Sequence, residues 1–219
     1  MARKKDPHLA AQKNQEGLTH FKNWEMDQAI AAFQQAVRAD AENPDYHLNL
    51  ARAHARSSDY HQAMSALGDY IRTEPDEKVA ERFERMFSSA LDEVETTLIE
   101  TMRQHKMSVQ QIGKAIQMWL EYRITLGRKQ FHAPKPALWA AALAYAICKV
   151  NFTNVKLAQV AAMFDVSDRA LKEKYADLVT ALDIMPADYR YFVGEQNPLD
   201  KLVEAAKALE ELDRRFQED

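Results

Sequence analysis

Cysteine, glycine and long apolar runs are all scarce in this sequence. The one cysteine, Cys148, excludes an intramolecular disulfide framework and any zinc site built on cysteines. Its Ala-rich, apolar surroundings predict a buried thiol. The five glycines are not clustered, so the sequence offers no glycine-rich loop to cradle a phosphate. There is also no run of about 18 apolar residues, and no membrane-spanning helix is predicted. Because the basic N-terminus lacks a following apolar stretch, we expect no secretory signal and a soluble, cytoplasmic protein.

The residues that are abundant favour helices. Ala, Leu, Glu, Gln, Lys and Arg dominate the sequence, and they lose little conformational freedom on entering a helix. Apolar residues make up 47% of the 219 positions, which is enough for one large or two modest domains with a real core. The composition therefore predicts an all-α fold.

Positive charge is concentrated in the middle of the chain. Residues 101–174 contain 12 Lys and Arg against 4 Asp and Glu. Residues 1–100 contain 12 against 18, and residues 175–219 contain 5 against 11. A basic block of this kind hints at an anionic partner, although the acidic flanks could neutralise it within the chain.

The N-terminal region contains a 34-residue repeat. The paired positions are Gly17/Ala51, His20/His54, Met26/Tyr60, Ala29/Ala63 and Phe33/Leu67. This pattern resembles the tetratricopeptide repeat, whose units are helix–turn–helix pairs of that length. The resemblance covers residues 8–76 and implies two helical hairpins, with no third copy after residue 78. The two histidines depart from the family, because that position is usually aromatic.

The family presents a concave groove to a protein or peptide. The resemblance places Lys22, Asn49, Arg52 and Arg56 toward this groove, where they would hold a carboxylate or an acidic peptide. The alternative is that they are ordinary solvated polar groups, and the pattern of the carboxylate-clamp subfamily is incomplete. Two repeats make a small groove, so another element must cap them. Apolar residues spaced by three and four predict one long amphipathic capping or connecting helix over residues 78–105.

Residues 108–185 are predicted to form a second helical domain. Ser108 and Gln111 form a capping-box pattern, and the Ala-rich run 136–152 predicts a central buried helix. The stretches Pro134-Lys135-Pro136, Ala140–Ala142 with Tyr145, LAQVAAMFDVS, and Leu171 with Tyr175 resemble a cyclin-like helical repeat of the transcription factor IIB type. They also resemble an uncharacterised bacterial domain family. A last helix is predicted over residues 197–217.

The resemblance implies a helix-turn-helix in residues 157–182, with Ser167 as the N-cap of its second helix. In DNA-binding proteins the second helix of this motif lies in the major groove. That helix has three basic and three acidic residues from 168 to 182, and a neutral helix binds phosphates weakly. The candidates for nucleic-acid contact are Arg169, Lys172, Lys174, Lys156, Lys149, Lys135, Arg128 and Lys129.

Two functions stay open at this stage. The first is a cytoplasmic regulator or adaptor, in which the repeats bind a protein and the second domain contacts DNA or a transcription complex. The second is a pure protein-interaction scaffold without nucleic-acid binding. No pattern predicts catalytic residues, a cofactor or a metal site, and His47, His54 and His61 are better explained as packing residues. An enzyme is therefore not expected.

Overall fold

The computed structural model describes residues 5–87, 91–129 and 133–194, and within them the protein is all-α without a strand. This agrees with the prediction from composition. The chain divides into two compact units, Met1–Leu91 with Leu120–His132, and Asp92–Trp119 with Ala133–Asp219. We call them the repeat unit and the C-terminal unit. Helix α7 (Val109–Leu126) contributes its first part to the C-terminal unit and its last part to the repeat unit.

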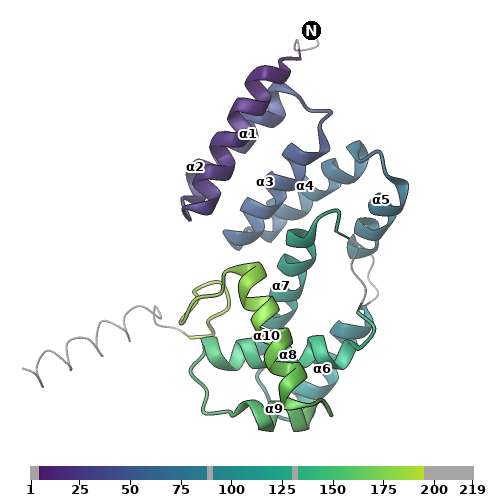
Figure 1. Ribbon diagram of the computed structural model, residues 1–219, viewed down its shortest axis with the longest axis vertical. Coiled ribbons are helices and arrows are strands. Elements are labelled where there is room, and N and C mark those ends of the chain that lie inside the picture. The colour runs from purple at the N-terminus through teal and green to yellow at the C-terminus, as the bar shows by residue number, and fades with distance from the viewer. Residues whose placement is uncertain (1–4, 88–90, 130–132, 195–219) are drawn as a thin grey trace, which may run out of the picture. The chain divides into compact units, whose positions relative to one another are not determined.

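The repeat unit begins with two helical hairpins. The first pairs α1 (Pro7–Lys22) with α2 (Met26–Ala39), and the second pairs α3 (Pro44–Arg56) with α4 (Tyr60–Thr73). The two helices of each hairpin lie side by side and run in opposite directions (Figure 1). These are the two hairpins that the 34-residue spacing predicts.

Local sequence signals explain where these helices start. The Asp6 carboxylate accepts a hydrogen bond from the Leu9 N–H at 3.0 Å, and Asn43 does the same for the Asp45 N–H at 3.0 Å. Such caps satisfy backbone donors that have no partner within the helix. The turns inside the two hairpins also repeat, because Trp24 and Ser58, 34 positions apart, both have a left-handed φ of 62°.

Each of the two unusual histidines has an acidic residue near its ring. His20 Nδ1 lies 2.6 Å from a carboxylate oxygen of Glu25, and His54 Nδ1 lies 3.7 Å from one of Asp59. In each case the acidic residue stands five positions after the histidine, just before the second helix of the hairpin. His20 therefore forms a hydrogen bond with Glu25, whereas the distance from His54 to Asp59 is too long for one.

The prediction of one long helix over residues 78–105 was wrong. The segment contains α5 (Glu77–Glu84), a short 3₁₀ turn at Arg85–Phe87 and α6 (Glu93–Gln104). A new helix starts because Asp92 and Glu95 form a reciprocal capping box, with N···O distances of 2.9 and 2.8 Å. Helices α5 and α6 are both amphipathic, and each has apolar residues spaced by three and four. In the sequence, the two apolar stripes together therefore look like the stripe of one long helix.

The cap of the repeats therefore differs from the predicted one. Ile124 of α7 is fully buried in the cluster that contains Leu48, Leu67, Tyr70 and Phe83. The last part of α7, together with α5, thus completes the core of the second hairpin.

The C-terminal unit is arranged around α8 (Pro136–Val150), which contacts α6, α9 (Leu157–Met163) and α10 (Asp168–Leu182). Most side chains of α8 are buried, which confirms the prediction of a central Ala-rich helix. The predicted capping box at the start of α7 is present as well. The Ser108 N–H donates to Gln111 Oε1 at 3.0 Å, and the Gln111 N–H donates to Ser108 Oγ at 3.1 Å.

A buried ion pair fixes the segment after α10. Arg190 and Asp188 are 0% and 1% exposed, and the guanidinium donates to both carboxylate oxygens at 2.9 and 2.7 Å. Arg190 also donates to the carbonyl of Leu182 in the last turn of α10, at 2.9 Å. The predicted helix over residues 197–217 lies outside the described residues.

Candidate functional site

The four side chains that are predicted to line a groove come from α1 and α3. In the first hairpin, α1 and α2 come close at Gly17, where an added Cβ would lie 2.6 Å from the Phe33 ring. Asn14 of α1 and Asn49 of α3 are joined by a hydrogen bond of 2.9 Å between their side chains. Asn49, a predicted groove residue, is only 8% exposed and serves to connect the two hairpins.

Arg52, another predicted groove residue, contacts the end of α7. Its guanidinium donates to the carbonyls of Ile124 and Thr125 at 3.4 and 3.0 Å, and to Asn49 Oδ1 at 3.1 Å. The carbonyls in the last turn of a helix lack partners within it, and a cation there also complements the helix dipole. Burial lowers the pKa of the Arg52 guanidinium.

Arg56 is likewise engaged within the repeat unit. Its guanidinium carbon lies 4.3 and 4.9 Å from the ring centres of Phe21 and Trp24, and its Nε lies 3.8 Å from Glu121 Oε1. Arg56 is 7% exposed and Glu121 only 1%. Both arginines that the repeat pattern assigns to a peptide ligand are thus in contact with the last part of α7.

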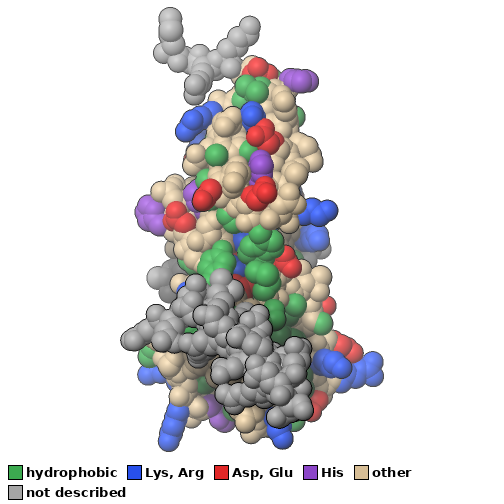
Figure 2. All heavy atoms as spheres, turned by 90° about the vertical axis from the view of Figure 1, so that its left-hand side faces the viewer, with side chains coloured by type: hydrophobic (Ala, Val, Ile, Leu, Met, Phe, Trp, Pro, Cys, Tyr) green, Lys and Arg blue, Asp and Glu red, His purple; other side chains and the backbone are tan. Residues whose placement is uncertain are grey.

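One face of α1 in the first hairpin is exposed. Ala11, Gln15, Leu18 and Lys22 recur at about one helical turn on α1, and all four are exposed. We call these four residues the α1 face. Leu18 is 38% exposed, and it lies one turn before Lys22, the predicted groove cation. The α1 face therefore offers an apolar contact next to a positive charge. Over the repeat helices in the upper part of Figure 2, acidic, basic and histidine side chains are intermixed.

The candidates for nucleic-acid contact are divided between the two units. Arg128 belongs to the repeat unit, where its Nε donates to Glu74 Oε2 at 2.8 Å and its Nη1 pairs with Asp45. Lys129 is in the same unit, and its carbonyl accepts a hydrogen bond from Arg82 at 2.7 Å. The six other nucleic-acid candidates belong to the C-terminal unit.

In the C-terminal unit, α9 and α10 are joined by a tight turn at residues 164–167. Asp165 has a left-handed φ of 53°, and Ser167 Oγ accepts a hydrogen bond from the Ala170 N–H at 3.3 Å, as predicted for an N-cap. The side chain of Arg169 is 91% exposed but lies 3.0 Å from Glu173. Lys172 is also exposed, and no acidic side chain among the described residues forms an ion pair with it.

The remaining cations of this unit are scattered. Lys174 pairs with Asp177 at 2.7 Å and lies 4.4 Å from the ring centre of Trp139. Three more lysines are exposed. Lys135 and Lys156 stand just before α8 and α9, and Lys149 lies in the last turn of α8. On the face drawn in Figure 2, the Lys and Arg side chains over the lower helices stand apart from one another.

The comparisons with known proteins address the repeat unit. Residues 20–82 match the family model of the tetratricopeptide repeat, from the end of α1 to α5. No curated protein and no solved structure matches the chain. Within the described residues, no helix is both long and apolar enough to cross a membrane. Nor do any three His, Cys, Asp or Glu residues of that part cluster in a way that could hold a metal ion.

Proposed function

We propose that this protein is a non-enzymatic, cytoplasmic adaptor whose repeats bind a protein partner at the α1 face. The observation that carries the proposal is the division of the groove. The second hairpin is closed by α7, while Leu18 and Lys22 on the first hairpin are exposed. The match of residues 20–82 to the tetratricopeptide repeat supports a role in protein binding. The ligand that fits this surface is a short segment carrying an apolar side chain and a carboxylate.

The test compares two leucines on opposite sides of the same helix. Leu9 and Leu18 are 42% and 38% exposed, and nine residues rotate the helix by about 180°. Affinity capture with quantitative mass spectrometry would be run with the wild type, Leu18→Asp, Lys22→Glu and Leu9→Asp. We expect that Leu9→Asp still captures the partners of the wild type, and that Leu18→Asp and Lys22→Glu both lose them. If all three variants recover the same partners as the wild type, binding uses another surface.

A second candidate is nucleic-acid binding through α10. It is favoured by Arg169 and Lys172, which are exposed in the first two turns behind the Asp165 turn and the Ser167 cap. It is opposed by Asp168 and Glu173 in the same turns, and by the binding of Arg128 to acidic groups of the repeat unit. The resemblance of residues 108–185 to a cyclin-like, transcription factor IIB-type domain supports the same candidate and stays a prediction.

Fluorescence anisotropy with labelled duplex DNA across a salt series decides between this candidate and a pure scaffold. Arg169→Ala/Lys172→Ala would be compared with Arg72→Ala/Lys78→Ala, which removes the same charges from exposed positions of the repeat unit. If α10 contacts DNA, the first variant alone lowers the slope of log K against log salt, by about 2 for two lost phosphate contacts. Absence of binding at low salt would favour the scaffold.

A further inference from the structure

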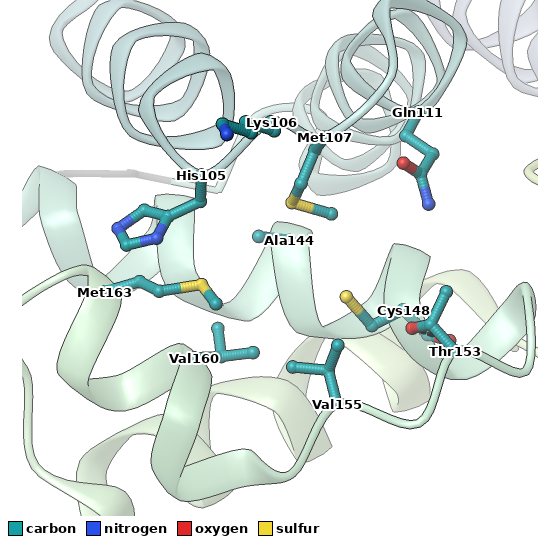
Figure 3. Close-up of a pocket in the computed structure, with 10 residues that line it drawn as sticks. All are labelled: His105, Lys106, Met107, Gln111, Ala144, Cys148, Thr153, Val155, Val160 and Met163. Carbon is teal, nitrogen blue, oxygen red and sulfur yellow. Dashed lines mark hydrogen bonds between the residues drawn. The ribbon is translucent and has the colours of Figure 1, made fainter.

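The C-terminal unit contains a pocket of about 190 Å³ that the proposed function does not use (Figure 3). Its floor is apolar and comes from two helices. Ala144 and Cys148 lie one turn apart on α8, and Val160 and Met163 lie nearly one turn apart on α9. Met107, from the turn before α7, closes the opposite side. Several elements of the unit therefore form one cavity.

Sulfur groups surround this cavity. Figure 3 shows the thioethers of Met107 and Met163 and the thiol of Cys148 pointing toward the same space. Thioethers on unbranched side chains adapt their shape to different apolar ligands. Cys148 is 3% exposed, and burial raises the pKa of its thiol, although the hydrogen bond with Thr153 opposes this effect. The thiol is therefore neutral at physiological pH, and the floor carries no charge.

The mouth of the pocket has the opposite character. His105 and Lys106, both exposed, stand in the turn after α6, and Gln111 stands in the first turn of α7. Gln111 Oε1 already accepts a hydrogen bond from the Ser108 N–H at 3.0 Å, so its amide NH₂ is the group that remains to donate. Within the described part of the chain, no Asp or Glu lines the pocket. The mouth thus offers donors and positive charge to an anion.

The turn that presents Lys106 has a defined conformation. Lys106 has a left-handed φ of 58°, and the N–H groups of Lys106 and Met107 donate to Arg103 and Met102 carbonyls, both at 3.0 Å. The backbone of Lys106 thus has a defined position beside the pocket, and its exposed side chain is long enough to turn toward a ligand at the mouth.

We propose that this pocket binds a small apolar carboxylate of the medium-chain fatty-acid type. The tail lies against Ala144, Cys148 and the two methionines, and the carboxylate meets Lys106 and the Gln111 amide. The size of the cavity sets the length of the tail. An apolar cavity of about 150 Å³ accommodates benzene, so a pocket somewhat larger than this suits about six to eight carbons.

The first experiment is a chain-length series measured by isothermal titration calorimetry. Butanoate, hexanoate, octanoate and the matching alcohols are titrated into the full chain. We expect the affinity to rise about fourfold for each buried methylene and to level off when the cavity is full. The carboxylate should bind about three- to fivefold more tightly than its alcohol, as expected for one partly exposed ion pair. Absence of saturable binding up to about 10 mM would overturn the proposal.

The only cysteine of the chain provides an independent readout. A bound tail would cover the Cys148 thiol, so octanoate should slow its modification by a small maleimide, and the protection should saturate at the calorimetric affinity. Modification at an unchanged rate in the presence of bound octanoate would show that the acid binds elsewhere and would overturn the assignment.

Variants separate the floor from the mouth. Ala144→Leu fills the cavity and should abolish octanoate binding. Lys106→Gln should lower the affinity for octanoate to that for octanol, whereas the matched control Lys149→Gln, on an exposed part of α8, should change neither. Circular dichroism checks that each variant is folded. If Ala144→Leu does not fold, the affinities of Lys106→Gln and the protection of Cys148 test the proposal without it. An unchanged preference for octanoate in Lys106→Gln would contradict the proposed carboxylate site.

Discussion

Replacement of Gly17 by alanine tests how closely the helices of the first hairpin approach. The added Cβ would lie 2.6 Å from two atoms of the Phe33 ring and 3.1 Å from a third. Phe33 is only 1% exposed, so its ring has little room to move. In a helix without this contact, Gly→Ala would stabilise the folded state by about 0.5–1 kcal/mol.

The steric cost at Gly17 outweighs that gain. Forcing an extra carbon into a well-packed core typically costs about 1–3 kcal/mol. We therefore expect Gly17→Ala to lower the free energy of unfolding by about 1 kcal/mol. Phe33→Leu removes part of the ring, so in that background Gly17→Ala should become stabilising. The expected coupling between the two changes is about 2 kcal/mol, within the range for residues in contact.

A urea titration followed by circular dichroism measures this cycle. Gly68→Ala in α4 is the matched control, because nothing lies within 4 Å of its added Cβ, and it should stabilise the repeat unit. The transition that Gly68→Ala shifts also identifies the unfolding of this unit. The explanation is refuted if Gly17→Ala stabilises the wild type as much as it stabilises the Phe33→Leu background.

Three further predictions concern buried groups. Ile124→Ala should lower the free energy of unfolding of the repeat unit by about 2–5 kcal/mol in the same titration, because α7 is part of that core. Burial raises the pKa of Glu74, but its contacts with Tyr70, the Asp76 backbone and Arg128 lower it below its ordinary value of 4.5. The ionised form is thus favoured by folding, and its contribution is complete above pH 4.5 and lost as the pH falls through the folded pKa. Urea titrations from pH 6 downward should show this loss in the wild type and a smaller one in Glu74→Gln. Asp188→Asn should destabilise the C-terminal unit by about 3–5 kcal/mol, as seen in thermal or urea unfolding, because it leaves a buried guanidinium without its counter-charge.

Much of the fold follows from local patterns in the sequence. The 34-residue spacing predicts the two hairpins, and Asn43-Pro44, Ser108 and Ser167 mark helix starts that the structure contains. The Ala-rich run predicts the buried helix α8. These features depend on neighbouring residues, so a single sequence reveals them. The division of the long segment after residue 78 was missed, because the capping box of Asp92 and Glu95 starts a new helix without interrupting the apolar spacing.

The predicted groove residues show that local patterns do not reveal contacts between distant parts of the chain. The repeat pattern predicts that Arg52 and Arg56 face a peptide ligand, and in the structure both contact α7, about 70 residues later. Nothing in the repeat pattern indicates which distant helix fills a groove. One signal was available, since the buried Glu121 is the only acidic residue of residues 101–164 and stands in an apolar helix pattern. An isolated acid in such a helix needs a cationic partner.

The basic block in residues 101–174 also shows that the sequence alone does not reveal which charged residues are neighbours. A sum over a stretch of sequence counts every cation equally, whereas binding of an anion depends on cations that are near one another and not already paired. Arg128 contributes to the sum, but it lies between Glu74 and Asp45. Arg169 and Lys174 also contribute, yet each lies within 3.0 Å of an acidic residue on α10. Lys22 and Lys106, in contrast, stand beside exposed or pocket-lining apolar groups. A cation next to apolar surface can recognise both halves of an amphipathic ligand, and this is the reason that both proposed sites involve carboxylates attached to apolar groups.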